Sequence, residues 1–189
     1  MLPATEALPV FQTVEEFERW EREHSMDGNY EFVRGRLIRK ETVQQAEAYL
    51  YAFLFRRFSE TAAYHRGDVL MAKAEVYVDE FRRRIPDLVH FSTEQLQAIR
   101  EGNRVGTAFA IEILNSSEKH EDVLERLQDY FDGGARLVWY TAPPVDTAKR
   151  RKIYVYTSPD ESKAFKGGEV ISAAPVVPDF EFVVGELFA

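Results

Sequence analysis

The sequence predicts an α/β (or α+β) protein in which helices flank a mixed central β-sheet. Segments with apolar residues at helical spacing are interspersed along the chain with short apolar runs typical of strands. One run, AFAIEIL, is almost wholly apolar, as expected of a central strand buried on both faces. A length of 189 residues suits one core, so we expect a single domain over residues 11–189 and a loosely held segment over residues 1–10.

The first part of the chain predicts a helix, a hairpin and a second helix. TVEEFERWERE has helical periodicity, and Thr13 and Glu16 have the spacing of a capping box. YEFVRGRLIRK predicts a hairpin that turns at Arg34-Gly35. From Thr42 to about Ala63 the apolar residues follow helical spacing, which predicts one long amphipathic helix.

Strands dominate the remainder. DVLMA, AEVYVD, IPDLVHF, AFAIEIL, RLVWYT and KIYVYT predict strands, and TEQLQAIREG predicts a short helix. SSEKHEDVLERLQDYFDGG predicts a helix capped by Ser116 or Ser117 and ended by Gly133 or Gly134. Its expected buried stripe is Val123, Leu124, Leu127, Tyr130 and Phe131. Residues 141–151 read as a loop, KAFKGGEVIS as a closing hairpin and FEFVVGELF as a terminal segment.

The composition excludes several classes of function. The 24 Lys and Arg residues against 32 Asp and Glu residues give a net charge of −8, which argues against a salt-driven DNA binder without catalysis. A metal-dependent enzyme acting on nucleic acid remains open, because its acids hold the cation that meets the phosphate. The absence of Cys excludes disulfides, a cysteine nucleophile and thiolate metal sites. With no membrane-length apolar run and no visible secretory signal, we expect a soluble, cytoplasmic protein that does not bind membranes.

Two acids in apolar strands are the first candidates for chemistry. Glu112 lies inside AFAIEIL, where a carboxylate is costly unless a partner or a metal satisfies it. Asp87 follows Pro86 at the start of IPDLVHF. Each has an ordinary alternative: Glu112 at an exposed strand end or paired with an arginine, and Asp87 accepting backbone N–H bonds. Acids on neighbouring strands can converge, however, and Mg²⁺ prefers such hard oxygen ligands.

Two further residues have equally open interpretations. Glu31 alternates with apolar neighbours in YEFV and either faces solvent or lies beside the other acids. Arg126 either forms an i,i+4 ion pair with Asp122 or reaches back toward Glu112. The basic runs at residues 82–84 and 149–152 read as loop surface that contacts phosphates if they flank a site. No HExxH, P-loop, GxSxG or GxGxxG motif occurs.

The order of these motifs resembles a known family. YEFVRGRL, a long helix, RIPDLVHF, AIEILNSS and a helix ending in DYFDGGARLVWY follow one another. This order is similar to the Uma-type (Uma-two) family of restriction endonuclease-like proteins, in the PD-(D/E)XK nuclease superfamily. The resemblance spans roughly residues 11–189 and implies a restriction-endonuclease-like fold, with a mixed sheet flanked by helices.

The resemblance also implies roles for individual residues. Glu31 matches the hairpin acid, Asp87 the aspartate of the PD motif and Glu112 the strand glutamate. Asp87, Glu112 and the backbone carbonyl of Ile113 would hold Mg²⁺ (or Mn²⁺), which activates a water and shields the phosphate. Glu31 would orient a second ligand or a water. DNA is the implied substrate, and a homodimer is expected because such nucleases often use two active sites.

The chain departs from the family pattern at three positions. Arg126 stands where the family has lysine, and it stays protonated, so it can stabilise charge but cannot accept a proton. No histidine occurs near Glu47, and Asn115 replaces a serine. The expected function is therefore a metal-dependent endonuclease that hydrolyses phosphodiester bonds. The alternatives are a catalytically silent nuclease fold that serves as a binding or assembly module, and a hydrolase of another phosphate ester.

Overall fold

A computed structural model describes residues 9–24, 26, 28–40, 45–114, 118–141 and 151–189 of the chain. The helices of the described residues are α1 (Val14–Glu23), the 3₁₀ turn η1 (Gln45–Glu47), α2 (Ala48–Ser59), α3 (Ala62–Arg66), α4 (Thr93–Arg100), α5 (His120–Asp132) and α6 (Val184–Leu187). The strands are β1 (Asn29–Val33), β2 (Arg36–Lys40), β3 (Val69–Ala72), β4 (Val76–Asp79), β5 (Arg82–Arg84), β6 (Leu88–Phe91), β7 (Phe109–Ile113), β8 (Leu137–Thr141), β9 (Lys152–Tyr156), β10 (Ser162–Lys166), β11 (Val170–Ala173) and β12 (Val177–Val183).

Within these residues the strands form a central sheet and two smaller ones. The central sheet has six strands in the order β10-β9-β8-β7-β6-β3. It is mixed, because β7 and β8 are parallel while the other neighbours are antiparallel. A four-stranded sheet, β2-β1-β5-β4, and the β11-β12 pair complete the fold. The predicted mixed α/β architecture is confirmed.

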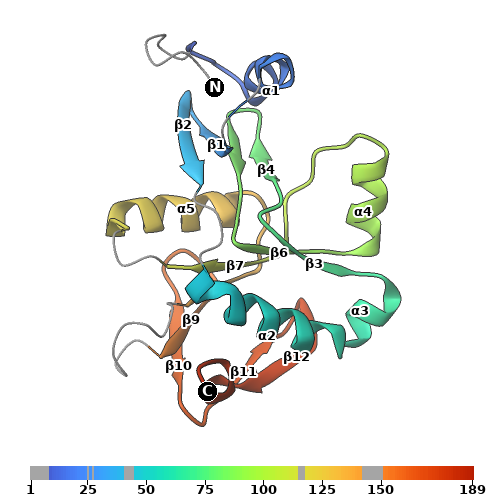
Figure 1. Ribbon diagram of the computed structural model, residues 1–189, viewed down its shortest axis with the longest axis vertical. Coiled ribbons are helices and arrows are strands. Elements are labelled where there is room, and N and C mark those ends of the chain that lie inside the picture. The colour runs from blue at the N-terminus through green and yellow to red at the C-terminus, as the bar shows by residue number, and fades with distance from the viewer. Residues whose placement is uncertain (1–8, 25, 27, 41–44, 115–117, 142–150) are drawn as a thin grey trace.

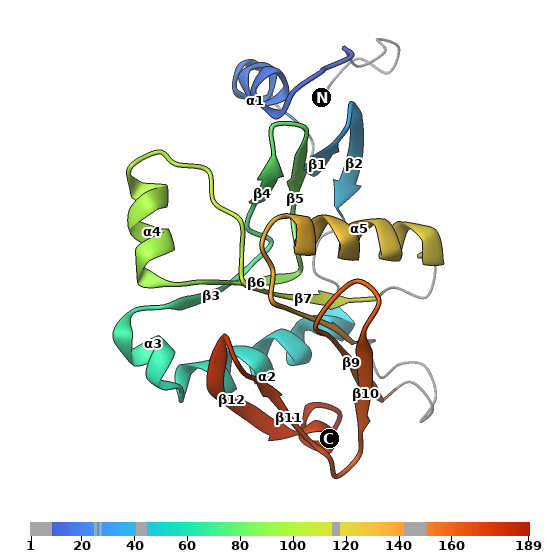
Figure 2. The same ribbon diagram turned by 180° about the vertical axis from the view of Figure 1, so that it is seen from behind.

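The central sheet is covered on both faces. On one face Leu127 and Tyr130 of α5 pack on Val89, Ala110 and Val138. On the opposite face α2 and the β11-β12 pair pack on Leu88, Phe109, Ile111 and Trp139, among other apolar residues. Figures 1 and 2 show α5 and α2 on opposite sides of β6 and β7. Alternation along each strand therefore separates the two halves of the core. Within AFAIEIL, the strand β7 is central, as predicted, and each of its five residues is buried.

The N-terminal elements form as the sequence predicts. The Thr13 hydroxyl accepts the N–H of Glu16 at 3.2 Å and caps α1. The Glu16 carboxylate accepts the N–H of Gln12 at 2.7 Å and not that of Thr13, so only the threonine half of the predicted capping box forms. The hairpin turns at Arg34 and Gly35, with φ angles of 47° and 82°, which is the left-handed conformation that two-residue hairpin turns require. This end of the molecule, with α1 and the small sheet, lies far from the C-terminal strands (Figure 1).

The helix predicted from Thr42 to about Ala63 is wrong at its C-terminal end, beyond Ser59. Helix α2 ends at Ser59. Thr61 caps the separate helix α3 by accepting a hydrogen bond from the N–H of Tyr64 at 3.1 Å. A threonine side chain competes for backbone hydrogen bonds and favours such a start. The predicted beginning of the helix, at residues 42–44, lies outside the described residues.

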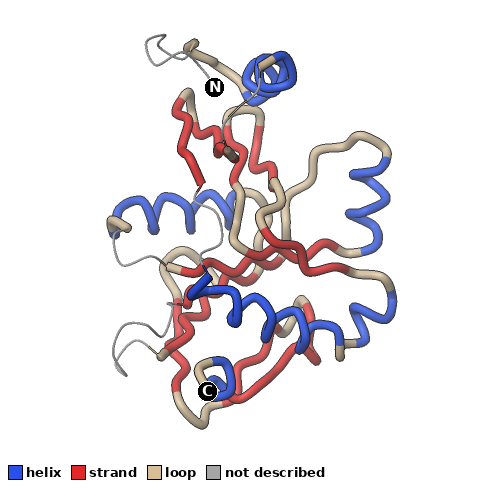
Figure 3. The backbone as a smooth tube through the Cα atoms, in the orientation of Figure 1, coloured by secondary structure: helices blue, strands red, loops and turns tan. Residues whose placement is uncertain are grey.

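Four other expectations need correction. Residues 82–84 are not a surface loop but the buried strand β5. KAFKGGEVIS is not a hairpin, because β10 pairs with β9 and β11 pairs with β12, as the tube in Figure 3 shows. Leu124, predicted to be buried, is 43% exposed. The prediction that Ser116 or Ser117 caps α5 is wrong, because the N-cap residue is Lys119, whose side chain makes no capping hydrogen bond; Gly133 ends the helix as predicted. Most of the loop at 141–151 lies outside the described residues.

Among the described residues, no helix is both long and apolar enough to cross a bilayer.

Candidate functional site

The two predicted acids lie opposite each other on adjacent strands. β6 and β7 pair antiparallel with Leu88 opposite Ile111 and Val89 opposite Ala110. Asp87 is the next residue along one strand and Glu112 the next along the other, so both side chains project from the same sheet face as Val89 and Ala110. A hydrogen bond with Asp87 is one of the interactions that lower the pKa of Glu112. Two segments separated in sequence thus form one carboxylate pair.

Asp87 is held by one backbone group and one cation. Its Oδ2 accepts the N–H of Ile113 at 2.6 Å, and its Oδ1 contacts the ammonium of Lys73. Burial and the charge of Glu112 raise the pKa of Asp87 to about 6, although Lys40 and Lys73 act in the opposite direction. The Ile113 contact is made by the amide, so the role of its carbonyl as a metal ligand stays a prediction.

Glu112 has a different environment, rich in donors. The hydroxyl of Tyr130 donates to Oε1, and Oε2 lies 3.5 Å from Arg126 Nη1 and 3.7 Å from Lys40 Nζ. Burial raises the pKa of Glu112, but Lys40, Arg126 and the Tyr130 hydrogen bond outweigh it and lower the pKa to about 2. Glu112 therefore remains ionised while Asp87 titrates near neutrality.

Arg126 reaches the site from helix α5. Besides Glu112 its guanidinium contacts Glu118, and the residue is 6% exposed. Of the two interpretations left open by the sequence, the one that directs Arg126 toward Glu112 is therefore confirmed. The guanidinium at this position, where the family resemblance implies a lysine, contacts two acids.

Glu31 lies beside the pair and is not solvent-facing. It is 1% exposed. Its carboxylate accepts a hydrogen bond from Arg84 Nη1 at 2.9 Å and another from the backbone N–H of Ile85 at 3.0 Å. Lys40 Nζ lies 3.9 Å from Glu31 and 3.7 Å from Glu112, so this one ammonium links Glu31 to the carboxylate pair. The prediction that the hairpin brings Glu31 near the other acids is confirmed.

The arginine run at residues 82–84 serves the fold at the edge of the site. All three side chains are buried and paired with acids. Arg84 joins Glu31 to Asp129, and Arg82 also bonds to Asp129. These cations are therefore committed to carboxylates within the protein, and the expectation that they contact phosphates at the surface is wrong. The other basic run falls largely outside the described residues.

Three residues beside the two acids are not indicated by the sequence: Lys40, Lys73 and Tyr51. Lys40 ends the hairpin strand, where it reads as an exposed residue. Lys73 follows β3 with a φ of 54°, a left-handed conformation that costs a non-glycine residue about 1 kcal/mol. Strain of this kind points to a residue held in place for its side chain, and here the side chain meets Asp87. Only that positive φ would have identified Lys73, and φ is not visible in the sequence.

Tyr51 of α2 is the third. It is 6% exposed and packs in the same apolar cluster as Leu88, Ile111 and Ile113, the neighbours of the two acids. Its hydroxyl is buried without a hydrogen-bond partner in the described structure. Burial raises the pKa of Tyr51, and the charges of Asp87, Glu47 and Glu112 raise it further. An unpaired buried hydroxyl costs about 1–3 kcal/mol, which favours a ligand oxygen near these acids as its missing partner.

The donor set suits a divalent cation that keeps part of its water shell. Among the described residues no group of three or more His, Cys, Asp or Glu side chains is arranged to hold a metal. Mg²⁺ is commonly bound by one or two carboxylates, with waters and substrate phosphates completing the octahedron. Asp87 and Glu112 meet this requirement, and the unpaired Tyr51 hydroxyl is a donor for an oxygen ligand. The pair therefore fits Mg²⁺ or Mn²⁺.

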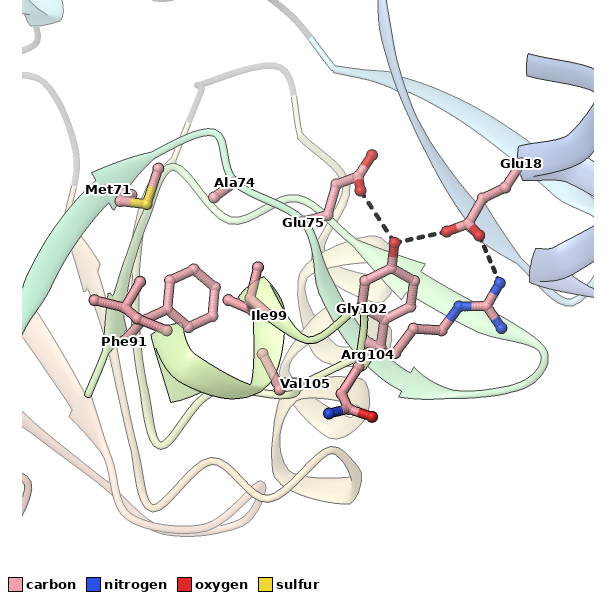
Figure 4. Close-up of a pocket in the computed structure, with 12 residues that line it drawn as sticks. Glu18, Met71, Ala74, Glu75, Phe91, Ile99, Gly102, Arg104 and Val105 are labelled. Carbon is pink, nitrogen blue, oxygen red and sulfur yellow. Dashed lines mark hydrogen bonds and ion pairs between the residues drawn. The ribbon is translucent and has the colours of Figure 1, made fainter. Parts of the chain in front are cut away.

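A separate cavity of about 830 Å³ lies along β3, β4 and the α4 segment. Apolar side chains such as Met71, Phe91 and Ile99 line it (Figure 4). At one end Glu18 accepts hydrogen bonds from Tyr77 at 2.6 Å and from Arg104. None of the four predicted site residues lines this cavity, so it is distinct from the carboxylate pair.

Comparisons with known proteins identify the family and the fold. The model of the Uma2 family, described as "Putative restriction endonuclease", matches residues 14–185. The chain is similar to the crystal structure of "a putative nuclease belonging to DUF820 from Anabaena variabilis", with a TM-score of 0.73 and 16% identity over 93% of this chain and 97% of the other. At this identity the likeness concerns the fold. No curated protein matches.

Proposed function

Because the chain belongs to the Uma2 family of restriction endonuclease-like proteins, we propose that it is a nuclease that hydrolyses DNA phosphodiester bonds at the Asp87–Glu112 pair with Mg²⁺ or Mn²⁺. Hydrolysis joins a water oxygen to phosphorus, breaks one P–O ester bond and leaves a proton on the departing oxygen. The observation that carries the proposal is the placement of two buried carboxylates on one face of adjacent central strands.

The residues at the carboxylate pair would have different roles in this reaction. Asp87 and Glu112 would hold the cation, which, when bound, lowers the pKa of its water and neutralises phosphate charge. Glu112 is suited to stay anionic, because its pKa is low. Tyr130 fixes the orientation of that carboxylate by donating to Oε1. Arg126, beside Glu112 and always protonated, would stabilise the additional negative charge that develops on the phosphate.

Plasmid cleavage tests this function. Supercoiled DNA is incubated with Mg²⁺ or Mn²⁺ and the wild type, Asp87→Asn, Glu112→Gln, or the control Asp160→Asn, which alters an exposed acid. Both amides keep the shape of the side chain but remove a charged metal ligand, so we expect each to lower the nicking rate by about 100-fold or more. Asp160→Asn should match the wild type. Equal nicking by all four proteins would exclude this site.

One observation favours the alternative of a silent nuclease fold that binds or assembles. Each acid already has a cation: Asp87 has Lys73, and Glu112 has Arg126 and Lys40. In that case calorimetry would detect no Mn²⁺ binding, and Arg126→Lys would stay inactive. If Arg126→Lys instead raises the cleavage rate, the chain is a weakened enzyme.

A further inference from the structure

We propose that Lys40 has two positions: it is the counter-ion of Glu112 and Glu31 in the metal-free protein, and it contacts a nucleic-acid phosphate once a divalent cation is bound. This inference rests on the proposed function, because it takes Asp87 and Glu112 as the ligands of that cation. It adds a phosphate-binding residue that neither the motifs nor the family resemblance indicates.

The position of Lys40 carries the first step. The last residue of β2 places its ammonium between the hairpin acid and the central strand, 3.9 Å from Glu31 Oε1 and 3.7 Å from Glu112 Oε2. The Lys40 side chain is 10% exposed and the two carboxylates are nearly inaccessible. Burial lowers the pKa of Lys40, but Glu112, Glu31 and Asp87 outweigh it and raise the pKa, so the group remains an ammonium.

The way Lys40 is held carries the second step. Both distances exceed the usual length of a hydrogen bond, so Lys40 is bound by charge and not by directed bonds. The neighbouring arginines are tied more firmly. Arg84 bonds to Asp129 as well as to Glu31, and Arg126 contacts Glu118 as well as Glu112. Of these three cations, Lys40 therefore loses the least when it turns away.

Lys40 and a divalent cation would compete for the carboxylate of Glu112. A divalent cation on Glu112 would share Oε2 with the Lys40 ammonium, and two cations at such short range repel strongly in a site with little water. Lysine has a flexible four-carbon stem and binds phosphate as a compact charge. The Lys40 ammonium is then free to pair with the phosphodiester that the cation brings to the carboxylate pair.

Two binding measurements test the inference. Lys40→Met removes the charge and keeps the length of the side chain, and Lys40→Gln, which keeps a polar group beside Glu31, gives the same comparison if the methionine variant folds poorly. Lys166→Met, at an exposed lysine of β10, is the matched control. Mn²⁺ binding is measured by calorimetry. Binding of a phosphorothioate DNA duplex is then measured by fluorescence anisotropy with Mn²⁺ at a concentration that saturates each protein.

The two measurements should change in opposite directions. Without the competing ammonium, Mn²⁺ alone should bind about tenfold more tightly to both Lys40 variants, whereas the duplex should bind about tenfold more weakly because one phosphate contact is lost. Lys166→Met should leave Mn²⁺ binding unchanged. If the wild type binds Mn²⁺ and the Lys40 variants bind Mn²⁺ or the duplex no differently, Lys40 does not have this role, and the proposed nuclease site stands. If no protein binds Mn²⁺, the proposed function itself fails, and the inference fails with it.

Discussion

The two acids of the site differ in what surrounds each carboxylate. Asp87 has one backbone donor and one lysine, and burial keeps its pKa high. Glu112 has a tyrosine hydroxyl, an arginine and a lysine, which together keep its pKa low. A cation must displace the proton of Asp87 at acidic pH but finds Glu112 already charged. Cation binding to Asp87 therefore depends on pH in the acidic range, whereas Glu112 is already charged there.

This difference predicts a pH-dependent stability. The pKa of Asp87 rises from 3.8 to about 6 on folding, so the native state holds a proton that the unfolded chain releases. The resulting stabilisation is complete below about pH 4 and is lost as pH rises through 6, on the order of 3 kcal/mol in total. We expect urea unfolding in EDTA to show this loss in the wild type but not in Asp87→Asn.

The comparison of the two proteins isolates Asp87. Burial lowers the pKa of His90, which also titrates in acid, but His90 is present in both proteins and cancels in their difference. The low pKa of Glu112 acts in the other direction and at lower pH, since its stabilisation is lost only as pH falls below about 4.5 toward 2. A difference curve that is flat between pH 4 and 7 would show that Asp87 is not proton-gated.

Local residue patterns predict the helices and strands better than they predict the side chains of the site. Residue periodicity identifies α1, α4 and α5, with the Thr13 cap as further support at α1, and a continuous apolar run identifies the central strand β7. β5 is missed because a run of arginines is typical of a surface, and its burial depends on ion pairs with acids of several other elements, including α1, α5 and the hairpin. Glu112 and Asp87 are found because charges are rare in apolar strands. Lys40 and Tyr51 are missed because the acids near them come from other elements.

Helix α2 contributes one unusual residue, Tyr51. The substitution Tyr51→Phe tests the role of its buried hydroxyl. The substitution removes a buried hydroxyl that has no partner in the described protein. We expect the metal-free variant to be more stable by about 1 kcal/mol, a rise of about 2–4 °C in Tm. Calorimetry should at the same time show weaker Mn²⁺ binding, because an oxygen ligand of the cation loses its donor.

Tyr77→Phe provides the control for this prediction. The Tyr77 hydroxyl donates to Glu18 at 2.6 Å, and both residues line the separate cavity. Its removal should lower Tm and leave Mn²⁺ binding unchanged, the reverse of the pattern at Tyr51. A Tyr51→Phe variant that is less stable than the wild type, or that binds Mn²⁺ equally well, would show that the Tyr51 hydroxyl has only a structural role.

At the scale of the molecule, the fold brings segments that are distant in sequence together around Asp87 and Glu112. The hairpin contributes Glu31 and Lys40, the end of β6 contributes Asp87, β7 contributes Glu112 and α5 contributes Arg126 and Tyr130. The central sheet fixes the strands in register, and α5 lies on the face from which the carboxylates project (Figure 1). Because the family model covers residues 14–185, all of these residues lie within the region shared with the family.

The central claim is that Asp87 and Glu112 hold one divalent cation between them. Crystals soaked in Mn²⁺ and measured at the manganese absorption edge test it most directly, because the anomalous signal locates the ion without reference to activity. We predict one strong peak per chain within about 2.1–2.3 Å of an oxygen from each carboxylate, with the Lys40 ammonium turned away from Glu112. Density with no peak at the pair, and Lys40 still beside Glu112, would contradict the account.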